Sequence, residues 1–352
     1  MKKELLIASA LVSTLGVASV ANAVTATMSG SYKTGLIGKA TDDTSTNDTT
    51  TDLQEGNFSV SLSETTDGGV GIASSFMLAN ESDSGTQTAG LTLTFTDGSK
   101  LDVIAGGNAA GTHDISVPGA AGDPGLTVTT TNRAQTGLDF FAAATGVGFE
   151  WHSASDFMAD GLKVSASFSA DTGAAAGASA ALESSWGLGA TYVTSAGDTA
   201  VTIGAGLADS EWKDSGTNPS SGSNGFHVGI SAVTGDLTVA AGYASGDYVS
   251  GNTTGEEYEI NDNEVTSVGA KYVTGDVTLS VGYTSGSGKD SETLGTAGTT
   301  EDALDTLGAG ISYAVASGVT ANIGFKDIDS QNDGGSDTKG GTSWYVGASM
   351  SF

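Results

Sequence analysis

Cysteine is absent from this sequence, and proline is rare, with three prolines among 352 residues. The fold must therefore hold without disulfides. With 53 glycines against three prolines, the composition favours closely packed strands and turns over helices. Basic residues are also scarce, because 12 Lys and Arg stand against 41 Asp and Glu, a net charge of −29 at pH 7. Such an acidic chain is excluded as a nucleic-acid binder.

Long apolar runs occur only at the start of the chain. Lys2 and Lys3 precede the apolar stretch Leu5 to Val20, and Ala21-Asn22-Ala23 follows it. These are the three regions of a secretory signal peptide, so we predict that residues 1–23 are removed and that the mature chain is 24–352. After them no apolar run approaches the roughly 18 residues of a membrane-spanning helix.

Motifs for catalysis are missing as well. The sequence has no HExxH, no complete GxGxxG between a strand and a helix, and no GxSxG elbow. His152 and Glu150 lie two residues apart on one strand, but such a pair is more often a wet polar surface than a catalytic dyad. We therefore predict neither an enzyme nor a cofactor.

The dominant pattern is alternation of apolar and small polar residues. From Val277 to Tyr283 every odd residue is apolar and every even one is small or polar, which indicates a strand with one apolar face. Short turns such as Gly235-Asp236 and Gly275-Asp276 alternate along the chain with long polar connections. Short turns at one end and long loops at the other are typical of an outer-membrane β-barrel.

Alternation and turn signals together predict an all-β, 16-stranded antiparallel transmembrane β-barrel. The segment Ala134 to Ala143 could form a further strand, but an odd number would place the chain ends on opposite sides, so it is left out. The expected strands are 25–38, 56–65, 69–79, 88–96, 100–105, 146–154, 161–170, 184–194, 198–208, 224–233, 236–244, 264–273, 276–284, 305–315, 319–327 and 342–352.

The two faces of these strands differ in polarity. Most aromatics fall on the apolar face, many at strand ends, as in the aromatic girdles of membrane barrels. The other face is rich in Ser, Thr and Gly and carries the strand charges, which predicts a water-filled lumen. The predicted lumen residues are Lys33, Lys100, Asp102, Glu150, His152, Lys163, His227, Lys271 and Lys326.

Most acidic residues fall in the long connections, so the loop end should be strongly negative. Divalent cations could bridge these loops to anionic lipopolysaccharide, and the candidate Ca²⁺ or Mg²⁺ ligands are Asp327, Asp329, Asp333 and Asp337. This segment lacks the bidentate glutamate of a calcium loop, so a solvated loop remains the alternative.

One stretch, Gly106 to Gly146, interrupts the alternation. It contains Pro118, Pro124 and Arg133, the only arginine of the chain. It is also the third long connection, which makes it either an insert inside the barrel or a long surface loop.

Three stretches resemble the Gram-negative general porins, most closely those of alphaproteobacteria. They are Met28 to Lys33, Ser59 to Gly69, and Trp344 to the terminal Phe352. The resemblance implies a 16-stranded outer-membrane barrel, usually a homotrimer, and implies that Phe352 is a signal to the barrel-assembly machinery. It also implies that the third long loop, here 106–146, folds inward and narrows the pore.

The resemblance makes the charged residues of this loop candidates for the constriction. They are His113, Asp114, Asp123, Arg133 and Asp139. Porins of this family commonly set such acids against arginines of the wall, whereas the predicted strands here carry none. Lysines could serve as point charges without the rigid guanidinium fork.

Two functions follow from these observations. The first is an outer-membrane porin for passive diffusion of ions and small hydrophilic solutes, weakly cation-selective because the mouth is negative. The second is a secreted or surface structural protein, such as an adhesin or β-solenoid. The solenoid predicts short tandem Gly-Gly-x-Gly-x-Asp repeats, and the sequence has none.

Overall fold

The computed structural model describes residues 24–41, 48–80, 87–103, 108–126, 134, 136–138, 140, 147–170, 182–212, 222–251, 257–291, 300–331 and 340–352. The predicted signal peptide, 1–23, lies outside the described residues. Across the described ranges, no helix is both long and apolar enough to cross a membrane.

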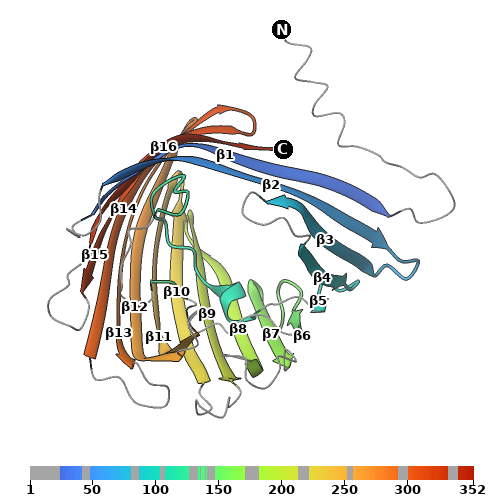
Figure 1. Cartoon of the computed structure of the whole chain (residues 1–352). Coiled ribbons are helices and arrows are strands. Elements are labelled where there is room, and N and C mark those ends of the chain that lie inside the picture. The colour runs from blue at the N-terminus through green and yellow to red at the C-terminus, as the bar shows by residue number, and fades with distance from the viewer. Residues whose placement is uncertain are drawn as a thin grey trace, which may run out of the picture.

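Sixteen strands form one closed antiparallel barrel, which confirms the predicted fold class (Figure 1). The strands are β1 (Thr25–Thr41), β2 (Thr49–Thr65), β3 (Gly71–Asn80), β4 (Gln87–Thr94), β5 (Lys100–Val103), β6 (Val147–His152), β7 (Leu162–Ala170), β8 (Leu182–Ala196), β9 (Thr199–Trp212), β10 (Gly222–Thr234), β11 (Leu237–Gly251), β12 (Glu257–Thr274), β13 (Val277–Ser291), β14 (Thr300–Ala316), β15 (Val319–Gln331) and β16 (Gly341–Ser351). A 3₁₀ turn, η1 (Gly111–His113), lies inside the barrel.

Each strand pairs with its neighbours in sequence, and β1 pairs with β16 to close the barrel. The last residue takes part in this closure, because the Phe352 N–H donates to the Gly30 carbonyl at 3.0 Å and the Gly30 N–H to the Phe352 carbonyl at 3.1 Å. Closure leaves no free sheet edge, so every strand has partners on both sides.

Tight turns join the strands at one end, which we call the turn end, and the opposite end is the loop end. Gly235 and Gly275 have φ of 55° and 57°, a left-handed conformation that glycine adopts without steric cost. The recurring Gly-Asp turns of the sequence thus correspond to real hairpins.

Several strands are longer than the sequence predicts, and the largest extensions are toward the loop end. β2 begins at Thr49 rather than residue 56, and β12 begins at Glu257 rather than 264. These extensions are mostly polar, with Leu53 as the one large apolar residue of the first and Tyr258 and Ile260 as those of the second. Apolar alternation this short does not mark a membrane strand. The segment Ala134 to Ala143 could have been a further strand. Its described residues form no strand, in agreement with its assignment to the insert.

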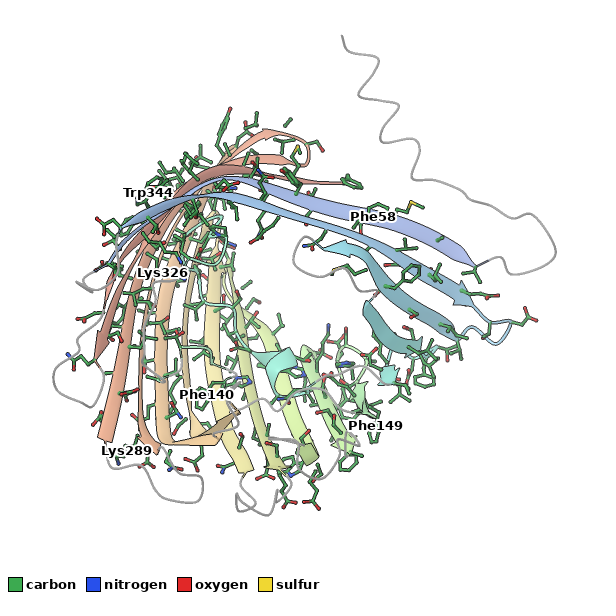
Figure 2. All side chains as sticks on the ribbon, in the orientation of Figure 1. Phe58, Phe140, Phe149, Lys289, Lys326 and Trp344 are labelled. Atoms are coloured by element: carbon green, nitrogen blue, oxygen red, sulfur yellow. The ribbon has the colours of Figure 1, made fainter. Side chains whose placement is uncertain are left out.

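Apolar side chains cover the outside of the barrel. Trp344, Ile323 and Val281 are exposed there, and Phe149 and Trp344 point outward from the wall (Figure 2). A soluble protein would bury such residues, whereas in a membrane they face lipid.

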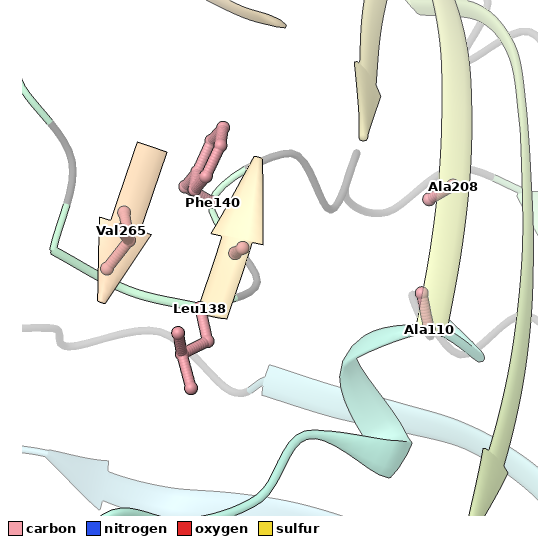
Figure 3. Close-up of a cluster of buried hydrophobic side chains, with 6 residues drawn as sticks. Ala110, Leu138, Phe140, Ala208 and Val265 are labelled. Atoms are coloured by element: carbon pink, nitrogen blue, oxygen red, sulfur yellow. The ribbon is translucent and has the colours of Figure 1, made fainter. Parts of the chain in front are cut away.

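A small hydrophobic cluster lies inside the barrel instead. It joins the insert to β9, β11 and β12 and consists of Ala110, Leu138, Phe140, Ala208, Ala244 and Val265 (Figure 3). Apolar packing therefore holds part of the insert to the inner wall.

Candidate pore constriction

The insert lies against the inner wall from β8 to β14, as the turquoise segment of Figure 1 shows. Glycines line its path, and a Cβ on most of them would collide with insert atoms. For example, a Cβ on Gly204 would strike the carbonyl oxygen of His113, and one on Gly269 or Gly282 that of Pro118. The glycines that contact the insert are Gly187, Gly189, Gly204, Gly206, Gly229, Gly242, Gly269, Gly282, Gly308 and Gly310.

This glycine track lets two backbones approach closely, because no side chain stands between them. The sequence counts these glycines only as small residues of the lumen face. Their role depends on which insert atoms lie opposite, and the alternation pattern does not contain that information.

The first anchor of the insert is His113. Its Nδ1 lies 2.6 Å from the Thr191 hydroxyl and its Nε2 lies 2.7 Å from the Ser165 hydroxyl. Ser165 in turn lies 2.8 Å from Nδ1 of His152. The insert and β6 to β8 therefore share one hydrogen-bond network.

Acidic groups complete this network. His152 Nε2 lies 3.0 Å from a carboxylate oxygen of Asp102, whose other oxygen accepts from the Thr92 hydroxyl. Glu150 is buried and accepts a hydrogen bond of 2.6 Å from the Thr112 hydroxyl of the insert. Predicted lumen residues thus surround a predicted constriction residue.

His227 forms the second anchor. Its side chain is 1% exposed, and its Nε2–H donates to the Ala110 carbonyl at 2.8 Å. Its Nδ1 lies 4.0 Å from Asp114 Oδ1. His113 therefore lies in the start of the insert, His227 contacts it, and His152 is joined to it through the Ser165 hydroxyl.

The environment of His113 opposes its protonation. Burial lowers its pKa to about 4, and repulsion from His152, His227 and Lys163 acts in the same direction. His113 is therefore neutral at pH 7, so one ring nitrogen donates to a hydroxyl and the other accepts from one.

Asp123 holds the tip of the insert. Its Oδ1 accepts from the N–H groups of Gly125 at 2.9 Å and Leu126 at 2.7 Å, and its Oδ2 lies 3.0 Å from Lys326 Nζ. Lys326 also donates to the Leu126 carbonyl at 3.2 Å, and the Tyr345 hydroxyl donates to the Ala121 carbonyl. A wall lysine thus pairs with an insert acid.

Replacing Lys326 with methionine should loosen this tip. A cysteine at Leu126, whose side chain is 1% exposed, would report opening by its rate of thiol labelling, since the chain has no other cysteine. Loss of a charge-assisted contact to Asp123 should raise labelling about tenfold.

Lys289→Met is the matched control, because Lys289 pairs with Asp262 at 2.9 Å at the loop end, away from the insert. It should leave labelling unchanged. In an Asp123→Asn background, Lys326→Met should have a smaller effect, and equal effects in both backgrounds would contradict the pairing.

The other predicted lumen charges lie on the inner face but do not converge. Lys33 pairs with Glu55 at 3.0 Å between β1 and β2. Within the part of the chain that the structure describes, Lys100, Lys163 and Lys271 form no salt bridge. Two of the predicted constriction residues, Arg133 and Asp139, lie outside the described residues.

The predicted metal ligands stay a prediction. Asp327 accepts from the Thr342 hydroxyl at 2.8 Å, and Asp329 lies opposite Asp305 in the β14–β15 register. Asp333 and Asp337 are outside the described residues. Among residues that the structure does describe, no group of three or more His, Asp or Glu could hold a metal ion.

Sequence reasoning missed several wall residues that hydrogen-bond to the insert, namely Tyr345, Thr191, Ser165, Ser167 and Ser280. Tyr345 is the clearest case, since it is an aromatic residue on the inward face of β16 and is 3% exposed. The signal in the sequence was an aromatic residue on the face of the strand that otherwise carries small polar residues. The hydroxyls of Thr191 and Ser165 are indistinguishable by pattern from their neighbours.

Together these contacts hold the insert against the inner wall from β6 to β16, inside a polar tube. Among the described insert residues the charges at these contacts are mostly paired, so we predict that the insert narrows the tube mainly by its bulk. Such a site can restrict the size of a passing solute without chemistry on it.

Comparison with known proteins agrees with this geometry. A family model described as Gram-negative porin matches residues 8–333. A search of curated protein sequences finds no match.

Solved structures show the same fold at low identity. OmpF of Salmonella typhi, in complex with daunomycin, has a TM-score of 0.62 at 16% identity, covering 93% of this chain and 97% of that one. An anion-selective porin of Comamonas acidovorans gives 0.61 at 12% identity, and a loop L8 deletion mutant of OmpT, an outer membrane protein of Vibrio cholerae, gives 0.60 at 16%. Each of these two covers 94% of this chain and all of its own.

The closed barrel and the family match favour the channel over the structural or adhesin alternative, and they place the protein in the outer membrane. The resemblance seen in the sequence is thereby confirmed: this chain belongs to the Gram-negative porin family.

Proposed function

We propose that the protein forms a water-filled, non-enzymatic channel for passive diffusion of ions and small hydrophilic solutes, with a weak preference for cations. The observation that carries this proposal is the insert fastened along the inner wall of a closed barrel. The insert contacts ten wall glycines and is anchored at His113 and Asp123. It therefore acts as a permanent constriction and not as a plug that can dissociate from the barrel.

The distribution of charge supports the cation preference. The loop ends of the described strands carry many acids but only two lysines, Lys39 and Lys289. The acids are Asp48, Asp52, Glu183, Asp209, Glu211, Asp247, Asp262, Glu264, Glu301, Asp302, Asp305, Asp327 and Asp329. A negative mouth concentrates cations, whereas paired charges at the constriction and three unpaired lumen lysines keep the preference weak.

The measurement is the reversal potential of single channels in a planar bilayer between concentrated and dilute KCl. The dilute side should become positive, by less than an ideal cation-selective membrane would give. The preference should shrink as salt rises, since salt screens the mouth. A clear anion preference at low salt would refute the cation selectivity and leave the channel itself standing.

Three partner proposals accompany the channel. The chain should assemble as a homotrimer, which a trimer form of OmpT from Vibrio cholerae among the similar structures supports. Phe352, paired with Gly30 at the closing seam, should present the C-terminal signal to the barrel-assembly machinery. Lipopolysaccharide should surround the acidic loop end, bridged by divalent cations.

A further inference from the structure

A polar chamber lies beneath the insert, separate from the His113 and Asp123 anchors. Its volume is about 560 Å³, and it lies between insert residues 116–122 and the inner wall of β10 to β14. On the wall side it is lined by one lysine, Lys271, and five hydroxyl side chains: Ser231, Thr238, Thr278, Ser280 and Ser312.

The strand register places these groups around Lys271. Lys271 is directly opposite Thr238 on β11 and Ser280 on β13. Directly opposed residues have Cβ atoms about 5 Å apart, so the lysine has a hydroxyl on each side. Thr278 lies opposite Ser312 on the next pair of strands, which continues the hydroxyl surface.

Charge in the chamber is unbalanced. No Asp or Glu is among its lining residues, and within the described ranges Lys271 forms no salt bridge. Its side chain is exposed to the lumen. The Ser280 hydroxyl donates to the Gly119 carbonyl, so the Thr238 hydroxyl is the donor beside the ammonium. An ammonium next to a hydroxyl donor is complementary to a carboxylate or phosphate oxygen.

The chamber is too large for a simple anion alone. A water molecule takes up about 30 Å³ in the liquid, so a space of about 560 Å³ accommodates a solute well beyond the size of a phosphate ion. The remaining wall hydroxyls are suited to hydrogen bonds with hydroxyl groups of the solute.

We propose that this chamber is a binding subsite for hydroxylated organic anions, namely sugars that carry a phosphate or carboxylate. Lys271 binds the anionic group, and the wall hydroxyls bind the sugar. The proposal rests on the proposed channel function, because the ligand reaches the chamber through the lumen.

The position of the chamber determines from which end of the barrel a ligand reaches it. Lys271 lies two residues from Gly269 toward the turn end, and Gly269 contacts Pro118 of the insert. The chamber therefore opens on the turn side of the insert, away from the acidic loop end. A ligand from that side does not have to pass the negative mouth.

The test uses block of the ion current through single channels in planar bilayers. Glucose 6-phosphate is added to one compartment and then to the other, and glucose and inorganic phosphate are tested separately. Glucose 6-phosphate should block at lower concentration than either comparison compound, and more strongly from the turn side. Lys271→Gln should raise its half-blocking concentration about tenfold.

Lys163→Gln is the matched control, because it removes another unpaired lysine from the lumen face, on β7, outside the chamber. It should leave the half-blocking concentration nearly unchanged. Thr278→Val removes one hydroxyl at nearly constant shape and should weaken block roughly fivefold. Ser280 is avoided because its hydroxyl also donates to the Gly119 carbonyl.

Two results would overturn the subsite. One is equal block by inorganic phosphate and glucose 6-phosphate, and the other is an equal loss in Lys163→Gln and Lys271→Gln. Conductance without sugar phosphate should persist in every variant. Absence of any conductance in the unaltered protein would instead refute the channel function, so the two failures are distinguishable.

Discussion

Replacing Gly282 with valine should push the insert away from the barrel wall and lower single-channel conductance. A Cβ at Gly282 would overlap the carbonyl oxygen of Pro118, and this oxygen also lies against Gly269 on the neighbouring strand. The atoms that this Cβ would meet, the Pro118 oxygen and the Gly119 Cα, belong to the backbone, so no side-chain rotation relieves the clash. Overpacking of this kind costs about 1–3 kcal/mol, and the insert can relieve it only by moving toward the open lumen.

Gly71→Val provides the control for this experiment. Gly71 is on β3, and the nearest atom to a Cβ there is on Thr94 at 3.4 Å, an ordinary contact. Folding of both variants is checked by heat-modifiable migration on a detergent gel. Unchanged conductance in a folded Gly282→Val barrel would mean that the insert does not depend on the glycine track.

Acidification from pH 6.5 to 4 should weaken docking of the insert through His113. The docked His113 has a pKa of about 4, whereas a released, hydrated histidine has its ordinary value near 6.5. Between these values the released state binds more protons, so docking loses stability as pH falls. The slope approaches about 1.4 kcal/mol per pH unit, and the total stays below about 3 kcal/mol because lumen water screens the charges.

The measurement is the frequency of conductance transitions in single channels over this pH range. His113→Asn keeps a hydrogen-bonding side chain without a titratable proton and should flatten the profile. Other charged or titratable groups also lie near this anchor, namely Asp102, Glu150, Asp114, His152, His227 and Lys163. Only the difference between the variant and the unaltered protein therefore assigns the pH effect to His113. An identical profile in His113→Asn would exclude His113 as the responsible group.

The barrel could be predicted from sequence because its signals are local. Alternation at Val277 to Tyr283 and the Gly275-Asp276 turn each determine a strand or hairpin from adjacent residues alone. The inward face of Lys326 and His227 follows from the same period. The strand extensions that begin at Thr49 and Glu257 were not predicted, because they are mostly polar and their few apolar residues form no sustained alternation.

The constriction was harder to predict from sequence, because its contacts join residues far apart in the chain. Asp123 and Lys326 were both candidates, but only the fold brings them to 3.0 Å. The absence of wall arginines predicts that the insert acts by bulk rather than by an electric field, and this stays a prediction. The Pro118 carbonyl oxygen lies against both Gly269 and Gly282. This contact depends on the path of the insert through the barrel, which no local sequence pattern encodes.

The seam between β1 and β16 has a consequence for folding. Every other strand pair joins neighbours in sequence, and all of them except β5 and β6, which the insert separates, can form as local hairpins. In contrast, Thr34 pairs with Ala348 from the far end of the chain. Closing so long a loop is slow, and until it closes both terminal strands expose unpaired backbone to other chains. In the finished seam the Trp344 and Phe352 rings lie over Gly38 and Gly30. Larger residues at these two glycines should therefore delay closure and favour aggregation, even where the mature channel tolerates them.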